Sequence, residues 1–280
     1  MTQPSPMPAP ADLRKAVFEA LADKAALPVR SMLVLGVLAG IYIGFGGLFA
    51  TIALTGADGL PYGVGQIVAG LVFATGLALV MIAGAELFTG NTMMTGAVLA
   101  GQIAPSRAAC ALAIVYAANF AGSLLLAGLV FAAGLHEGQN GAIGRAAVDL
   151  ARGKTEAGFL ATLSSGILAN MLVCLAVWCA YAGETVTQKL AGLTLPVAAF
   201  VAAGFEHSVA NMYLLPYGWL VQPAAPEVNE AITAFAILAN LIPATIGNII
   251  GGAIVATAYW LAFAKPQTLS VKPAIREGTA

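Results

Sequence analysis

Long uncharged runs dominate this sequence of 280 residues. No Asp, Glu, Lys or Arg occurs within eight ranges, which are 31–56, 60–85, 87–105, 108–135, 157–183, 190–205, 208–226 and 231–264. Several of these runs exceed the ~20 apolar residues with which an α-helix crosses a bilayer. The runs are continuous and do not alternate at period two, which argues against a transmembrane β-barrel. The sequence therefore predicts an all-α polytopic membrane protein that contacts the lipid bilayer.

The composition supports this fold class and removes several others. Charged residues make up 9% of the chain, against roughly 25% in a soluble globular domain. The net charge of −1 comes with no basic stripe, so nucleic acid is not an expected partner. The two histidines and three cysteines lack metal-ligand spacing, and GFGG at 44–47 lacks the third glycine of a dinucleotide site. We therefore expect no metal, no cofactor and no enzyme activity.

The chain divides into two membrane halves between polar ends. Residues 1–30 are expected as a cytoplasmic tail that ends in an amphipathic helix over 11–27, lying on the membrane surface. A loop over 136–156, outside the membrane, separates the first half (31–135) from the second (157–264), and 265–280 form a second cytoplasmic tail. Six spanning helices are expected, over about 31–55, from about 63, and over about 106–135, 157–182, from 190, and 231–263.

The two halves repeat each other weakly. GVLAG at 36–40 matches GILAN at 166–170, and NFAG at 119–122 matches NIIG at 248–251. Between them, GAELFTGNTM from Gly84 matches GFEHSVANM from Gly204, each with Glu two residues and Asn seven residues after the Gly. Three helices per half is an odd number, so the second copy must be inverted in the membrane. Inverted repeats are typical of transporters and channels whose site lies near the bilayer midplane.

The distribution of Lys and Arg predicts the orientation. With the N-terminus inside, nine of these residues are cytoplasmic, and only Arg145, Arg152 and Lys154 lie outside. Because short cytoplasmic segments carry the excess of Lys and Arg, both termini are expected in the cytoplasm.

Two of the uncharged regions carry features that a spanning helix avoids. Glycine and small polar residues crowd the segment 86–96, and Glu206 stands beside His207 within the segment 203–208. Glycine costs about 1 kcal/mol inside a helix, and Thr and Asn side chains compete for backbone hydrogen bonds. We therefore expect helices two and five to be broken there. Because broken backbone survives at membrane depth only beside protein or water, two matching breaks indicate one shared pathway.

The ionisable residues at these breaks have structural alternatives. Glu86 and Glu206 can each cap a half-helix or bond backbone N–H groups, and this role stays open beside a role in transport. His207 can be a core histidine, but ionisable groups inside a membrane usually serve function, so we take it as a site residue. Lys154, judged from the residues alone, is typical of a solvated loop.

Five motifs resemble the formate/nitrite transporter family. They are GAELFTGNTM (84–93), KTEAGF (154–159), GILANMLVCLAVW (166–178), GFEHSVANM (204–212) and LIPATIGNIIGG (241–252). The similarity extends in order over roughly 31–264, and GFEHSVANM is the most specific motif. The resemblance implies an aquaporin-like inverted repeat of three plus three helices, with helices two and five broken. It also implies a homopentamer in the prokaryotic inner membrane, with one pore in each protomer.

The resemblance also implies the residues of the pathway. The family's central histidine falls on His207, with Glu206 as its acidic neighbour, and the threonine that faces it across the pore falls on Thr89. The vestibule lysine that draws anions falls on Lys154, and the polar position of helix four on Asn170. The apolar constrictions of the pore fall on Phe73, Leu77, Leu87, Val173 and Phe200.

These residues suit a channel for small monovalent weak acids. A bare anion loses tens of kcal/mol of solvation in an apolar medium, so rings of Phe and Leu exclude it. Lys154 concentrates the anion at the mouth, the falling dielectric lets it take a proton, and the neutral acid then passes Thr89 and His207. We expect formate as the substrate, with nitrite as the alternative, because ELFTGNTM looks nitrite-like. Hydrosulfide, a passive pore for small neutral solutes, a proton-coupled carrier, and gating by the N-terminal helix all stay open.

Overall fold

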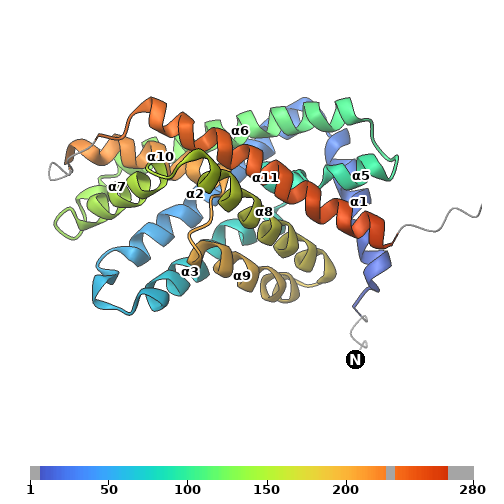
Figure 1. Ribbon diagram of the computed structural model, residues 1–280, viewed down its shortest axis with the longest axis horizontal. Coiled ribbons are helices and arrows are strands. Elements are labelled where there is room, and N and C mark those ends of the chain that lie inside the picture. Colours follow the sequence, from blue (N-terminus) through green and yellow to red (C-terminus); the bar gives the residue numbers. More distant parts are fainter. Residues whose placement is uncertain (1–6, 225–230, 264–280) are drawn as a thin grey trace, which may run out of the picture.

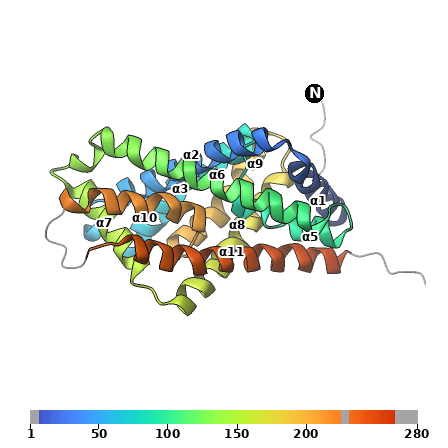
Figure 2. The same cartoon turned by 90° about the horizontal axis from the view of Figure 1, so that it is seen from above.

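The structure is a computed structural model that describes residues 7–224 and 231–263. All regular elements of these residues are helical. In Figures 1 and 2, α7 (Ala142–Thr155) and α10 (Ser208–Val221) lie at one end of an elongated bundle, and α1 (Pro10–Ala26) and α5 (Met94–Leu99) lie at the other. We call these the α7 end and the α1 end. The expected C-terminal tail over 265–280 and residues 1–6 of the expected N-terminal tail lie outside the described residues.

Within the described residues, five helices are long and apolar enough to cross a membrane, which confirms the predicted fold class. They are α2 (Val29–Leu54), α3 (Tyr62–Ala83), α6 (Pro105–Ala132), α8 (Phe159–Ala182) and α11 (Ala234–Ala262). The fifth expected spanning segment is divided into α9 (Val186–Ala202) and α10 (Ser208–Val221), neither of which reaches that length. A count of six spanning helices therefore stays a prediction.

Small residues bring the helices of each half into close contact. A Cβ atom on Gly40 of α2 would collide with the backbone of Asn119 in α6, and one on Gly247 of α11 would collide with Leu163 in α8. The α2–α6 and α8–α11 pairs occupy equivalent places in the two repeats. Close backbone approach at small residues is the usual means of helix association in lipid.

Two amphipathic helices differ from expectation. The segment 136–156, expected as a loop, contains α7, which buries Ile143, Ala147, Val148 and Ala151 along one side. The turn formers before it, including Gln139 and Asn140 at φ 55°, hid this helical period. Helix α1 forms as predicted, but its apolar side does not lie on lipid. That side is buried against α5, α6 and α8, with Phe18 1% exposed and stacked edge-on against Trp178.

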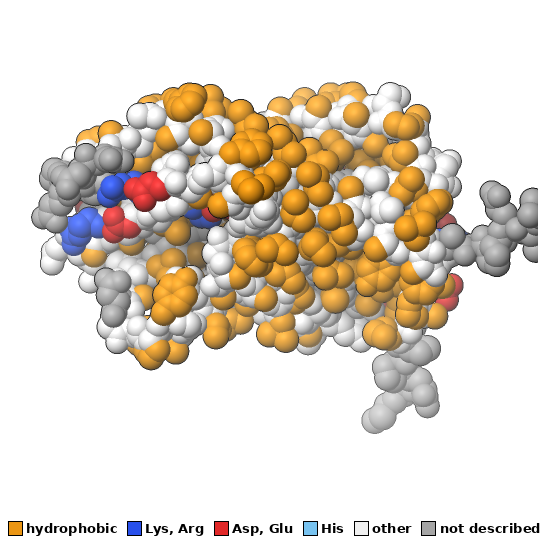
Figure 3. All heavy atoms as spheres, viewed as in Figure 1, with side chains coloured by type: hydrophobic (Ala, Val, Ile, Leu, Met, Phe, Trp, Pro, Cys, Tyr) orange, Lys and Arg blue, Asp and Glu red, His pale blue; other side chains and the backbone are white. Residues whose placement is uncertain are grey.

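The surface has the charge distribution of a membrane protein. In the face shown in Figure 3, apolar side chains cover the middle of the bundle, while Lys, Arg, Asp and Glu gather near the α7 end. Large apolar side chains are exposed on several helices, among them Leu125 and Leu129 in α6 and Leu238 in α11. A belt of this kind fits hydrocarbon, since charged groups are costly there.

Candidate functional site

Both predicted breaks are present, and their backbones match. Helix α3 ends at Gly84 (φ 76°) and α9 ends just before Gly204 (φ 71°), where the left-handed conformation favours glycine. Three residues outside any helix follow each glycine, and the last of them, Leu87 or His207, has extended backbone angles. They lead into α4 (Phe88–Asn91) after the first break and into α10 after the second. The helix axis is thereby interrupted twice inside the bundle.

One buried asparagine satisfies the backbone at each break. Asn119 of α6 donates to the carbonyls of Gly36 (2.7 Å) and Glu86 (2.8 Å) and accepts from the N–H of Phe88 (2.9 Å). Non-helical backbone inside a membrane needs such partners. In the sequence this asparagine is visible only as the first residue of the NFAG repeat motif, so its partners were missed.

The second break has the same arrangement around Asn248 of α11. Its Nδ2 donates to the carbonyls of Gly166 (2.8 Å) and Glu206 (2.9 Å), and its Oδ1 accepts from the N–H of Ser208 (2.8 Å). The two asparagines therefore make equivalent sets of contacts in the two halves.

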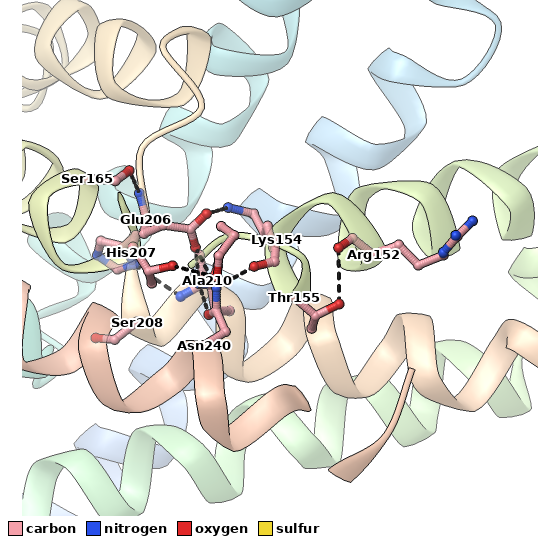
Figure 4. A network of polar contacts seen from close by, with 12 residues as sticks. Arg152, Lys154, Thr155, Ser165, Glu206, His207, Ser208, Ala210 and Asn240 are labelled. Carbon is pink, nitrogen blue, oxygen red and sulfur yellow. Dashed lines mark hydrogen bonds and ion pairs between the residues drawn. The ribbon is translucent and has the colours of Figure 1, made fainter. Parts of the chain in front are cut away.

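Glu206 lies in a buried polar network on the α7 side of the second break (Figure 4). Its Oε1 accepts from Nζ of Lys154 at 3.0 Å, and its Oε2 accepts from Nδ2 of Asn211 at 2.5 Å and of Asn240 at 3.3 Å. Asn240 also donates to the carbonyl of Lys154 at 2.9 Å. The Lys154 and Glu206 side chains are only 13% and 7% exposed. Lys154 is therefore a partly buried ion-pair partner and no ordinary loop lysine.

Glu86 makes the corresponding contacts at the α1 end. Nζ of Lys24 lies 2.5 Å from its Oε1, and Nδ2 of Asn91 lies 2.7 Å from its Oε2. Sequence reasoning missed Lys24 because it stands among several charges of an amphipathic helix. The repeat is the signal that points to it, since α1 stands to the first break as α7 stands to the second.

His207 and Thr89 meet between the two breaks. His207 is the N-cap of α10, and its Nδ1 accepts from the N–H of Ala210 at 3.0 Å. The neutral ring therefore carries its proton on Nε2, and this atom lies 2.9 Å from Oγ1 of Thr89. Thr89 accepts that bond and keeps its own hydroxyl proton for another acceptor. Both side chains are buried, at 2% and 0% exposure.

Asn170 and Thr92 hold the loop that carries Thr89. Oγ1 of Thr92 donates to the carbonyl of Thr89 at 2.6 Å, and Nδ2 of Asn170 lies 3.2 Å from the same carbonyl oxygen. Nδ2 of Asn170 also donates to the carbonyl of Asn248 at 2.5 Å. Asn170, expected in the pathway, thus links the two breaks through hydrogen bonds.

Two cavities approach this contact from opposite ends. The vestibule, about 380 Å³ in volume, opens at the α7 end and is lined by Lys154, Glu206 and His207 among others. A smaller cavity of about 110 Å³ at the α1 end is lined by residues that include Lys24 and Leu87. The two share no lining residue, so the contact of Thr89 with His207 lies in the barrier between them.

The predicted constriction residues divide between the two sides. The Phe73 and Phe200 rings pack edge to face at 5.5 Å in the vestibule, and Phe200 stacks on His207 at 5.7 Å. Leu87 lines the smaller cavity. Leu77 and Val173 are buried and line neither cavity. Within the described ranges, no group of three or more His, Cys, Asp or Glu is placed to hold a metal ion.

Comparison with known proteins extends along nearly the whole chain. Residues 11–261 match the formate/nitrite transporter family. Formate channel FocA of Escherichia coli (strain K12) is 36% identical over 267 residues, covering 91% of this chain and 94% of that protein. Formate channel FocA of Haemophilus influenzae is 37% identical over 231 residues, covering 78% and 81%. A solved structure described as a pentameric formate channel with formate bound has a TM-score of 0.76 at 35% identity, covering 85% and 98%.

Proposed function

We propose a function from one premise: this chain belongs to the formate/nitrite transporter family. Within that family we propose a channel for small monovalent weak acids, with formate as the substrate. The relatives described as formate channels support this choice. The solved pentameric formate channel supports a homopentamer, and the bacterial relatives together with the apolar belt of the bundle support a place in the inner membrane. We place the α7 end outside and both termini in the cytoplasm, following the charge rule.

The observation that carries the proposal is the polar contact of Thr89 with His207 between the two cavities. A bare anion that left the vestibule would lose most of its solvation behind the Phe73–Phe200 pair. The protonated acid loses far less, because desolvation opposes only the charged form. An acid that gains its proton in the vestibule therefore crosses the barrier as a neutral molecule.

Thr89 and His207 match the hydrogen-bonding groups of such an acid. The His207 ring donates from Nε2, and the hydroxyl of Thr89 both donates and accepts. A carboxylic acid that inserts between them accepts from Nε2 through its carbonyl oxygen and donates its O–H to Thr89. It thereby replaces one buried hydrogen bond by two and leaves no polar atom unpaired.

Uptake into proteoliposomes tests the proposal. We expect labelled formate to enter, with the rate rising as the pH falls towards the acid's own range, and glycerol to stay outside. Nitrite is the second candidate, because the family includes nitrite transporters. Faster nitrite than formate uptake would reverse the substrate assignment, whereas rapid glycerol uptake without pH dependence would indicate a passive neutral pore.

A further inference from the structure

A second cavity adjoins the vestibule at the α7 end. This antechamber of about 670 Å³ lies between the segment 54–66, which links α2 to α3, and residues 142–150 of α7. The antechamber and the vestibule share five lining residues, namely Leu54, Tyr62, Gln66, Asp149 and Leu150. The shared set marks the junction through which the two cavities communicate, and Asp149 is its one charged member.

Asp149 is a carboxylate without a partner at that junction. Across residues 7–224 and 231–263, no Lys, Arg or His nitrogen lies within 4 Å of its carboxylate and no donor bonds it. Arg145, one turn away, instead donates to the carbonyl of Asn140 at 3.1 Å. Lys154 is already bonded to Glu206. Asp149 is thus an exposed carboxylate that forms no ion pair with a described residue at the junction a solute crosses into the vestibule.

The lining charges of the two cavities balance. Arg145 and Lys154 are positive, while Asp149 and Glu206 are negative, so the antechamber and vestibule together carry no net charge. Without Asp149 the same lining would carry a net positive charge and would attract anions of every valence.

We propose that Asp149 selects solutes by charge at the entrance of the α7 end. Its carboxylate offsets the attraction of Lys154, so that neutral acids and monovalent anions enter while divalent anions are held off. This inference rests on the proposed function, because it concerns what reaches the same vestibule.

Coulomb's law gives the proposal a signature that needs no exact distance. The interaction energy is proportional to the charge of the solute, so removing one charge changes the affinity for a divalent anion by the square of its effect on a monovalent anion. At a separation of about 7 Å in water, the monovalent effect is about threefold, and the divalent effect about ninefold.

The test compares Asp149→Asn with Asp149→Glu in proteoliposomes, with formate and sulfate added at the α7 side. At about 0.02 M ionic strength, where screening is weak, Asp149→Asn should lower the half-saturating formate concentration about threefold. It should lower the inhibitory concentration of sulfate about ninefold. Asp149→Glu should keep the wild-type values, and Arg145→Gln should shift both concentrations upward. About 0.5 M salt should abolish all these differences, because the Debye length falls to a few ångströms.

Each outcome separates this proposal from the function on which it rests. Wild-type protein that carries no weak acid would overturn the proposed function itself. Wild-type transport with Asp149→Asn unchanged at low salt would overturn only the role of Asp149. So would equal shifts for formate and sulfate, or shifts that persist in high salt, because neither follows from charge.

Discussion

Replacing Lys154 by Gln tests whether the buried ion pair is structural, recruits substrate, or does both. The change removes the cation 3.0 Å from Oε1 of Glu206 and leaves that carboxylate with Asn211 and Asn240 as donors. Breaking a buried pair by removing one partner costs about 3–5 kcal/mol, because the remaining charge stays desolvated. The Lys154 side chain is 13% exposed, so we expect the lower part of that range. Lys154→Glu is a poorer probe, since it would place two carboxylates together.

The double variant Lys154→Gln, Glu206→Gln removes both charges and serves as the matched control. Its glutamine at 206 still offers an oxygen to Asn211, so most of the lost stability should return. We expect a coupling free energy of about 2–3 kcal/mol from the thermodynamic cycle, which is typical of residues in one network. The measurement is thermal unfolding of the purified assembly in detergent, followed with both single variants beside the wild type.

Formate uptake by the double variant then tests whether Lys154 recruits the substrate, separately from its structural role in the ion pair. We expect a folded protein whose half-saturating formate concentration is raised several-fold at low ionic strength, since the cation is gone. Two results would refute the reasoning. A Lys154→Gln variant as stable as wild type would show that the pair carries no desolvated charge. Wild-type uptake at low formate by the double variant would show that Lys154 does not recruit.

Four further variants probe the barrier itself. His207→Phe should slow formate flux at every pH tested while leaving its rise with falling pH, because it removes the Nε2 donor of the barrier contact and not the protonation of the acid. His207→Asn should in addition pass current, and paired flux and current recordings check both. Leu87→Ala with Phe200→Ala should raise lactate passage relative to formate, whereas an unchanged ratio in assembled protein would place the constriction elsewhere. Gly252→Ala places a Cβ against Oγ1 of Thr92, the hydroxyl that donates to the carbonyl of Thr89 at the first break. In intact protein this change should slow uptake at least about tenfold. Gly128→Ala, where a Cβ meets nothing within 4 Å, is its control.

The sequence was sufficient for the features that a membrane enforces. Uncharged runs predicted the spanning helices, and glycine with polar residues at equivalent places predicted the two breaks around Glu86 and Glu206. Both signals are local, because each follows from what a stretch of chain tolerates in hydrocarbon. The motifs that resemble the family supplied Thr89 and Asn170, and composition alone does not single these out.

What the sequence did not reveal depends on contacts between distant elements. Helix α7 was hidden because its apolar residues are few and its partner helix α10 lies some sixty positions later. Lys24 and Lys154 stand 62 and 52 positions from the glutamates they bond. Asn119 and Asn248 bond the backbone of the breaks over 33 and 42 positions. Hydrophobic periodicity and helix propensity describe residues that are close along the chain. They contain no information on contacts between residues far apart in the sequence.

The repeat itself identifies where the chain departs from a shared framework. Each half has the Lys–Glu–Asn network and the capping asparagine, so these contacts satisfy the structural needs of a break. Leu87 and His207 occupy the same place in the two halves, with nearly equal backbone angles of −103°, 120° and −107°, 111°. The first half forms its break with no side-chain cap from Leu87. The break therefore does not require the imidazole that caps α10.

At the place where the framework permits an apolar residue, one half presents Leu87 to the smaller cavity, and the other presents His207 to the vestibule. A solute from the α7 end meets a hydrogen-bond donor, and one from the α1 end meets a methyl group. That difference, set within an otherwise matched pair of breaks, is the strongest structural argument that His207 serves passage more than folding.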